Sequence, residues 1–351
     1  MPLPSLFVLP LLAFALAFLC HVFALKIFPR LGLLDFPERY GLKRKRLPYP
    51  TGMLCVLIFL LFYALFETWT MQTVGIVMGI AFLGIVTFID DRAPLPYWVR
   101  ILVQVLVATV IFLTGTRIFS LTNPLEAWTG IPVIDLDSII IISPFFSNPS
   151  LLGLVFTVGW LGLTMNALNW FDGIPGQVSA LSVIGFLTIG FLSMSARVDQ
   201  PDLAVLAFIL AGVAAAALVF DIPPARVIMG DSGAMFFGLM LGVLTLYTGG
   251  KVATAFLVLG VPLIDSFLVV LRRMRKGASP FRGDTKNEHL HHRLLRKGWK
   301  PLNIIFLTAI IGTGFGTIAL FLSTFEKFIA ALVLVGIMVA LSWYSRSKMK
   351  T

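Results

Sequence analysis

Charged residues are scarce in this chain. Only 13% of the 351 residues are Asp, Glu, Lys or Arg, whereas 58% are hydrophobic, and the mean hydropathy is +0.95. A soluble domain is typically about a quarter charged and about half apolar. The composition therefore excludes an ordinary soluble domain and predicts a polytopic membrane protein.

Cysteine and histidine are also rare. The two cysteines, Cys20 and Cys55, fall within apolar runs, so the sequence carries no disulfide framework. Three of the four histidines lie close together between residues 289 and 292, and the fourth, His21, is predicted to be a satisfied polar group inside the first apolar run. No low-complexity segment or internal repeat is visible.

Long apolar runs are what the chain has in abundance. A helix needs about 20 apolar residues to cross the hydrocarbon core of a bilayer. About eleven runs meet this length: 5–28, 51–68, 72–89, 97–115, 150–169, 177–195, 202–220, 233–250, 252–271, 302–322 and 326–344. The first run has no basic leader and no small-residue cleavage site, so we expect it to be retained. The sequence predicts an all-α, polytopic transmembrane fold with a single domain over 1–351.

The basic residues predict how these helices are oriented. With the N-terminus outside, all but four of the 27 Lys and Arg residues fall on the inner side, in the loops 29–50 and 272–301 above all. Positively charged loops stay in the cytoplasm. We therefore expect an outer N-terminus and a cytoplasmic C-terminus, and we attribute the net charge of +10 to topology and lipid contact, not to nucleic acid. The long outer segment 116–149 could hold a short hairpin or an interfacial helix.

Four polar clusters interrupt the apolar runs, and in this orientation all of them lie on the cytoplasmic side. They are Asp90-Asp91, the stretch from Asn166 to Gly173, the stretch from Met229 to Gly233, and the stretch from His289 to His292. Ionisable groups near hydrocarbon are costly and usually mark function or a buried partner. Their convergence predicts a catalytic site at the membrane surface.

Each cluster also has a simpler structural interpretation. Asp90 and Asp91 end a helix, where the dipole disfavours negative charge, so they need Mg²⁺ or a basic side chain; they could equally be topological charges paired with Arg92. Asn166 and Asp172 share a helix face with Asn169, which suits a hard cation or interhelical hydrogen bonds.

The other two clusters are similarly ambiguous. Asp231 or Ser232 could cap the next helix, whose N-terminus and flanking glycines would also suit a phosphate. The histidine loop, which includes the basic residue Arg282, favours phosphate binding over zinc because no Cys or Glu-x-x-His partner accompanies it. Asp265, inside an apolar run, needs a partner or lines the site. Two Gly-x-x-x-Gly pairs, at 75–79 and 238–242, could be helix-packing faces.

Together, the four clusters resemble the motifs of the polyprenyl-phosphate N-acetylhexosamine-1-phosphate transferases, a membrane family of glycosyltransferase family 4. The resemblance covers most of the chain and includes Asp35-x-Pro37 and Pro48-x-Pro50-x-Gly52 in the first inner loop. The form His-Leu-His-His is closer to the branch of WecA and TagO than to MraY, which has three consecutive histidines.

The resemblance implies a reaction and a role for each residue. A lipid phosphate attacks the β-phosphorus of a UDP–N-acetyl sugar, which gives a polyprenyl-pyrophosphoryl sugar and UMP, the first membrane step of a cell-envelope glycan. Asn169 and Asp231 would bind Mg²⁺, or Mn²⁺ in its place. The catalytic residues would be Asp90, Asp91 and His291, and the substrate-binding residues would be Asn166, Asp172, Gly173, Asp221, Arg100, His289, His292 and Arg282. The implied location is the bacterial cytoplasmic membrane, with the active site facing the cytoplasm, N-acetylglucosamine as the favoured sugar, and a homodimer as an open alternative.

Two positions depart from the family pattern. Pro175 stands where the family usually has Asp, and Asp221 stands where it usually has Asn. Both would lie near the nucleobase, where an ionised Asp cannot donate a hydrogen bond and Pro has no polar side chain. Two alternatives therefore remain open: a family member with altered nucleotide specificity or no turnover, and a transporter of lipid phosphates or lipid-linked sugars.

Overall fold

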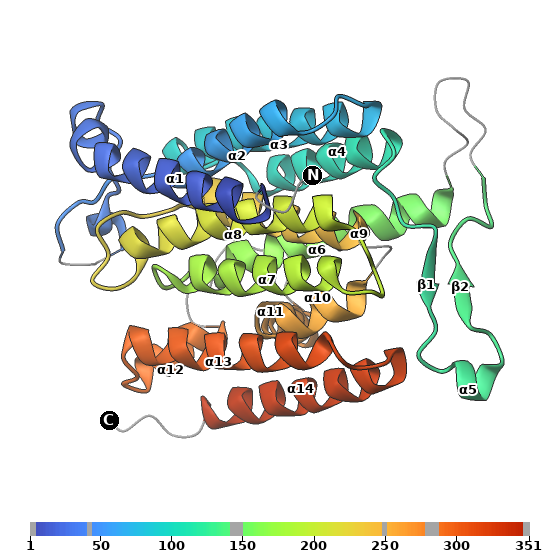
Figure 1. The fold of residues 1–351 in the computed structure, drawn as a ribbon. Helices are drawn as coiled ribbons and strands as arrows, with labels where there is room; N and C mark the ends of the chain where they lie inside the picture. The colour runs from blue at the N-terminus through green and yellow to red at the C-terminus, as the bar shows by residue number, and fades with distance from the viewer. Residues whose placement is uncertain (1–4, 41–43, 141–149, 248–250, 278–287, 347–351) are drawn as a thin grey trace.

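The computed structural model describes residues 5–40, 44–140, 150–247, 251–277 and 288–346, and helices dominate this part of the chain (Figure 1). The helices are α1 (Ser5–Arg30), the short 3₁₀ helix η1 (Pro37–Tyr40), α2 (Gly52–Phe66), α3 (Met71–Arg92), α4 (Tyr97–Leu113), α5 (Glu126–Thr129), α6 (Leu151–Phe171), α7 (Gln177–Met194), α8 (Pro201–Asp221), α9 (Asp231–Tyr247), α10 (Val252–Val258), α11 (Gly260–Arg275), α12 (Leu290–Arg296), α13 (Pro301–Ala319) and α14 (Thr324–Tyr344).

The predicted all-α membrane fold is confirmed. Among the described residues, 7 helices are long and apolar enough to cross a membrane, and the bent pair α10–α11 raises this number to 8. The helices α2, α4 and α9 are apolar but shorter. Each of these helices lies in one of the intervals that the sequence predicts, within a few residues. The count of about eleven spans, which would need the three shorter helices, stays a prediction, as does the orientation.

The interval 252–271 is bent, which the sequence did not predict. It forms α10 and α11, which meet at a bend of 84°. Figure 1 shows α11 nearly end-on, whereas the neighbouring helices run across the view. Two features explain the bend: Gly260 begins α11 with no side chain to obstruct Leu334 of α14, and α11 carries three arginines in its last turn. A helix with a basic end favours the membrane interface over the hydrocarbon core.

Small residues let the central helices pack closely. A methyl group at Gly238 of α9 would lie 2.6 Å from the backbone oxygen of Thr164 in α6, and one at Gly79 of α3 would lie 3.1 Å from Ile111 of α4. The two Gly-x-x-x-Gly pairs are thus helix-packing faces, as predicted. In contrast, large apolar side chains such as Phe7 on α1 and Ile310 on α13 are exposed on the outside of the bundle, where lipid would cover them.

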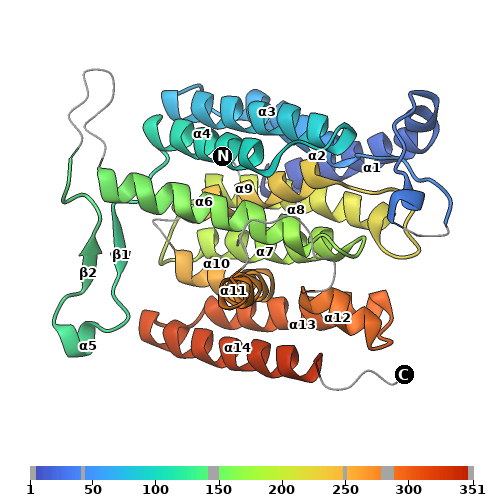
Figure 2. The same cartoon turned by 180° about the vertical axis from the view of Figure 1, so that it is seen from behind.

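A small hairpin lies at one end of the bundle. Strands β1 (Ser120–Thr122) and β2 (Val133–Asp135) pair antiparallel, with Leu121 opposite Ile134, and α5 lies between them. Figures 1 and 2 show this hairpin at the end opposite α12. The prediction of a hairpin or short helix in the segment 116–149 is therefore confirmed for its described part.

A candidate active site at one end of the bundle

The four polar clusters meet at the end of the bundle that holds α12. Helix α3 ends there with Asp90-Asp91, α6 ends there at Phe171, and α9 begins there at Asp231 (Figure 1). The sequence predicted that these clusters share one side of the membrane, and the fold places them at one end. The site is therefore assembled from helix termini, where unpaired backbone groups and polar side chains are both available.

Asp91 holds the start of α9. Its carboxylate accepts hydrogen bonds from the backbone N–H of Asp231 at 2.8 Å and of Ser232 at 3.1 Å, and from the hydroxyl of Tyr49 at 2.7 Å. The positive end of α9 stabilises this negative charge. The cap that the sequence assigned to Asp231 or Ser232 is supplied instead by Asp91 of α3.

Arg100 joins two further carboxylates. Its Nε lies 2.8 Å from Oδ2 of Asp90, and its Nη1 lies 3.2 Å from Oδ2 of Asp231. The other oxygen of Asp90 accepts the backbone N–H of Leu95 at 2.6 Å. Asp90 thus has Arg100 as its basic partner, where the sequence suggested Arg92 as an alternative; the guanidinium of Arg92 instead donates to the backbone oxygen of Gly32.

The polar residues at the end of α6 divide into two kinds. Asn166 forms a reciprocal pair with the buried Gln104 of α4, which is the interhelical interpretation of this residue. The side chains of Asn169 and Asp172 make no hydrogen bond within the described part of the chain, and both are half-buried. These two oxygen-bearing groups are therefore available to a ligand.

Asp221 fixes the turn that follows α6. Its Oδ2 accepts the backbone N–H of Gly176 at 2.8 Å and the hydroxyl of Ser179 at 2.9 Å, so it caps the start of α7. Burial raises the pKa of Asp172 well above its usual value, and the negative charges of Asp221, Asp231 and Asp91 raise it further. That concentration of negative charge would be relieved by a cation. The predicted contact between Asp221 and a nucleobase stays a prediction.

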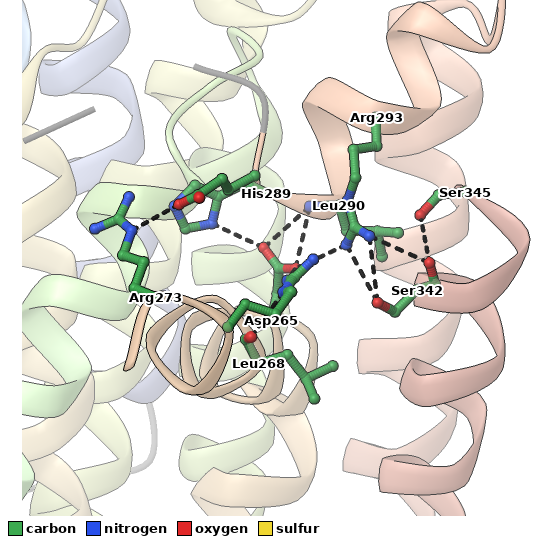
Figure 3. Close-up of polar contacts among 10 residues, drawn as sticks. Asp265, Leu268, Arg273, His289, Leu290, Arg293, Ser342 and Ser345 are labelled. Carbon is green, nitrogen blue, oxygen red and sulfur yellow. Dashed lines mark hydrogen bonds and ion pairs between the residues drawn. The ribbon is translucent and has the colours of Figure 1, made fainter. Parts of the chain in front are cut away.

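Asp265 organises the histidine cluster (Figure 3). Its carboxylate accepts the backbone N–H of Leu290 at 3.1 Å and lies 2.9 Å from Nδ1 of His289, so it caps α12 from α11. Arg293 of α12 donates to the backbone oxygen of Ser342 in α14 at 3.2 Å, which fixes the far side of the same helix. The buried Asp265 therefore has its partner in the histidine segment.

His291 is the histidine that reaches the end of α6. Its ring lies so close to Gly173 that any side chain at Gly173 would collide with it, and it packs edge-on against Phe171. The ring is 2% exposed, and neither nitrogen has a hydrogen-bond partner in the described part of the chain. Burial lowers the pKa of His291 well below its usual value, and the neighbouring His292, His289 and Arg293 lower it further, so the ring is neutral at pH 7.

A small cavity lies beside His291. It measures about 10 Å³, which is about the space of one water, and its lining includes Gln177, Asp265 and Thr308. Gln177 is 1% exposed, and both ends of its amide lack a partner among the described residues. Buried polar atoms are nearly always satisfied by protein, water or ligand. Gln177 and His291 are therefore the groups that a small polar molecule would bridge.

Three residues of the site were not found from the sequence: Tyr49, Gln104 and Gln177. Gln177 alone carried a signal, because it is a polar residue directly after a Gly-rich turn. Arg282, predicted to bind substrate, lies outside the described residues. His289 and His292 lie within the cluster, His289 against Asp265 and His292 with its ring centroid 4.1 Å from that of His291.

The donor set suits a hard cation that keeps part of its own hydration. Within the described residues, no three His, Cys, Asp or Glu side chains are gathered closely enough to hold a metal by themselves. Mg²⁺ is commonly bound by one or two carboxylates, with waters and substrate phosphates completing the octahedron. Asp231 and the amide of Asn169, which has no partner among the described residues, fit that mode of binding.

Comparisons with known proteins point to one family. Residues 73–249 match the family model described as Glycosyl transferase family 4. A Bacillus subtilis protein named probable undecaprenyl-phosphate N-acetylglucosaminyl 1-phosphate transferase is 27% identical over 71% of this chain and 66% of its own length. The decaprenyl-phosphate N-acetylglucosaminephosphotransferase of Mycolicibacterium smegmatis is 30% identical over 66% of this chain and 57% of its own. The undecaprenyl-phosphate alpha-N-acetylglucosaminyl 1-phosphate transferase of Escherichia coli K12 is 27% identical over 67% of this chain and 63% of its own. The chain thus spans less than two thirds of the length of each of these relatives.

Proposed function

The chain belongs to glycosyl transferase family 4, and on that premise we propose that it transfers N-acetylglucosamine-1-phosphate from UDP-N-acetylglucosamine to a polyprenyl phosphate. The products are a polyprenyl-pyrophosphoryl sugar and UMP. The names of the relatives support the sugar and the lipid acceptor. The proposal of uridine as the base rests on the resemblance of the sequence motifs.

One observation carries this proposal. Arg100 pairs with Asp90 and Asp231 at one end of the helix bundle, and Asp91 holds the backbone of Asp231 there. Asn169 and Asp172 stand at the end of α6, and their side chains make no hydrogen bond among the described residues. An enzyme of phosphoryl transfer must hold the two reactants in line and neutralise their negative charge, and the protein itself forms few or no covalent bonds. A cation site beside an arginine at the edge of a membrane meets that need for a lipid phosphate and a sugar nucleotide.

The reaction forms one bond and breaks one. An oxygen of the lipid phosphate attacks the β-phosphorus of the sugar nucleotide, and the bond from that phosphorus to the bridging oxygen breaks, so that UMP leaves with the electron pair. Mg²⁺ held by Asp231 and Asn169 would neutralise the phosphate oxygens as charge develops on the leaving group. Arg100 would contact a phosphate oxygen, because a guanidinium matches phosphate geometry.

Asp90 and Asp91 then act mainly by positioning neighbouring residues, and removal of a proton from the lipid phosphate is a minor part of their role. A phosphate monoester has a second pKa of about 6 and is already largely dianionic at pH 7. Asp91 is fully engaged in holding the start of α9, which places Asp231, and Asp90 orients Arg100. Both carboxylates would act on substrate through these neighbours.

A panel of radiolabelled sugar nucleotides tests the function directly. Membranes that contain the protein, with polyprenyl phosphate added, should convert UDP-N-acetylglucosamine to a lipid-extractable product with release of one UMP per lipid formed. Empty membranes and UDP-glucose serve as controls. Bound nucleotide without UMP release would instead support a relative without turnover, and release of lipid-linked sugar on the opposite side without new pyrophosphate would support a transporter.

We also propose that the site faces the cytoplasm in the bacterial inner membrane. The distribution of charge along the sequence supports this orientation, because all but four of the 27 Lys and Arg residues fall in the segments expected on the inner side. Cysteine introduced at Lys300 should resist an impermeant thiol reagent in intact cells and react once the cells are opened. Cysteine introduced at Trp128, in the opposite hairpin, should react in intact cells. The reverse pattern would overturn the orientation.

A further inference from the structure

A groove on the side of the bundle remains unexplained by the proposed reaction. It lies between α11 and the end of α14 and has a volume of about 240 Å³. Its lining combines three arginines, Arg272, Arg275 and Arg346, with apolar and aromatic side chains that include Leu268 and Trp343. A basic pocket with apolar walls matches the chemistry of a lipid headgroup joined to its acyl chains.

The positive charge around this groove is not balanced within the described residues. Arg275 and Arg346 make no ion pair there. Arg272 lies 4.0 Å from the carboxylate of Asp265, and the other carboxylate that attracts it, that of Glu288, is paired with Arg273. Asp265 is already shared with His289 and Arg293. Burial lowers the pKa of Arg293 to about 10, and repulsion from Arg272 and Arg346 contributes. An anion in the groove would relieve this repulsion.

The surroundings of the groove place it at the membrane surface. Helix α11 lies across the bundle, as Figures 1 and 2 show, and it exposes Phe267 and Met274 beside its basic end. Trp343, 75% exposed, stands at the last turn of α14. Amphipathic helices with basic and aromatic residues settle at the boundary between headgroups and acyl chains, and Trp marks that boundary.

We propose that this groove is a binding site for the phosphate headgroup of an anionic phospholipid of the surrounding bilayer. Arg275 and Arg346 hold the phosphate, because guanidinium groups bind phosphate oxygens in pairs. The acyl chains run along Leu268 and Trp343. The site is separate from the proposed transfer chemistry and does not depend on it.

The lipid would touch residues that also hold the histidine helix. Arg272 lines the groove and lies near Asp265, which caps α12, and Ser342 lines the groove and accepts the hydrogen bonds of Arg293 (Figure 3). A bound headgroup therefore stabilises the framework that places His291 against Gly173. Lipid binding should therefore raise the unfolding temperature of the protein in anionic lipid.

The test measures lipid binding, not turnover. Purified full-length protein is titrated with dioleoylphosphatidylglycerol or dioleoylphosphatidylcholine, and the bound lipid is counted by native mass spectrometry. The double variant Arg275→Gln with Arg346→Gln should bind phosphatidylglycerol about 30-fold more weakly than the unmodified protein, because each basic group near an anionic lipid contributes about 1 kcal/mol to the binding free energy. Phosphatidylcholine binding should not change.

The matched control is Lys26→Gln with Arg30→Gln. It removes the same charge from the same end of the bundle, on the exposed end of α1, which lies across the bundle from α14 (Figure 1). This control should keep the preference for phosphatidylglycerol. An equal loss in both double variants, or no loss in the first, would overturn the site. So would polyprenyl phosphate that binds more tightly than phosphatidylglycerol and is lost in the same variant, since the groove would then belong to the acceptor lipid.

Discussion

Removal of divalent cations with excess chelator is expected to abolish transfer, and Mg²⁺ should restore it. Asp231→Ala should lower kcat by about a thousandfold or more even at saturating Mg²⁺, and Asn169→Ala should approach that loss. A metal that neutralises phosphoryl charge lowers the activation barrier by several kcal/mol. The physical basis is the position of Asp231 at the first turn of α9, among the carboxylates Asp91 and Asp172, which repel one another without a cation.

Two further measurements separate the metal from the ion pair that Asp231 makes with Arg100. Mn²⁺ binding, followed by electron paramagnetic resonance, should be lost in Asp231→Ala but retained in Arg100→Gln, although both variants lose the ion pair. Asp135→Ala in the opposite hairpin is the matched control and should change neither binding nor kcat. Full turnover in excess chelator would refute the proposal that the reaction needs a metal.

The helices and the location of the site were readable from the sequence because both depend on local signals. An apolar run of about 20 residues crosses a bilayer whatever its neighbours are, so the intervals for α1, α6 and α8 could be placed within a few residues. Asp90-Asp91 and Asp231 interrupt such runs, and interruption alone locates them at helix ends. The fold then brings these ends to one end of the bundle.

The partners of these residues could not be read in the same way, because they are contacts between distant segments. Nothing local in Asn166 indicates that Gln104 faces it, and nothing local in Asp221 indicates that it holds Gly176. The break between α10 and α11 could not be predicted from local sequence either. Its apolar residues favoured one span, and the packing of Gly260 against Leu334, which helps to explain why the chain turns there, is a contact between distant segments.

Three aspartates show a common principle. Asp91, Asp221 and Asp265 each accept backbone N–H groups at the start of another helix: α9, α7 and α12 respectively. A carboxylate at a helix N-terminus is stabilised by the helix dipole and by charge-assisted hydrogen bonds. These residues therefore connect the polar segments to one another, and loss of any one should displace a whole helix start. Aspartates that the sequence alone suggests as catalytic or substrate-binding groups therefore also hold helix starts in place.

The last prediction concerns the contact between Gly173 and His291. Gly173→Ala should lower kcat by about a hundredfold, as the loss of a positioned acid–base or hydrogen-bonding group does, because the new methyl group would occupy the place of the His291 ring. The backbone at Gly173 does not have a positive φ, so alanine is not strained there and the effect falls on His291. The unfolding temperature in detergent should fall by only a few degrees.

A double-mutant cycle distinguishes this from general damage. His291→Ala should cause a similar loss of kcat, and Gly173→Ala with His291→Ala should be no worse than His291→Ala alone, because both changes remove the same ring from the same place. Gly159→Ala, on helix α6, which ends just before Gly173, has no atom within 4 Å of the added methyl group and should leave kcat unchanged. Additive losses in the double variant would mean that Gly173 acts on the reaction through some group other than His291, and unchanged turnover in Gly173→Ala would mean that the buried ring has no part in catalysis.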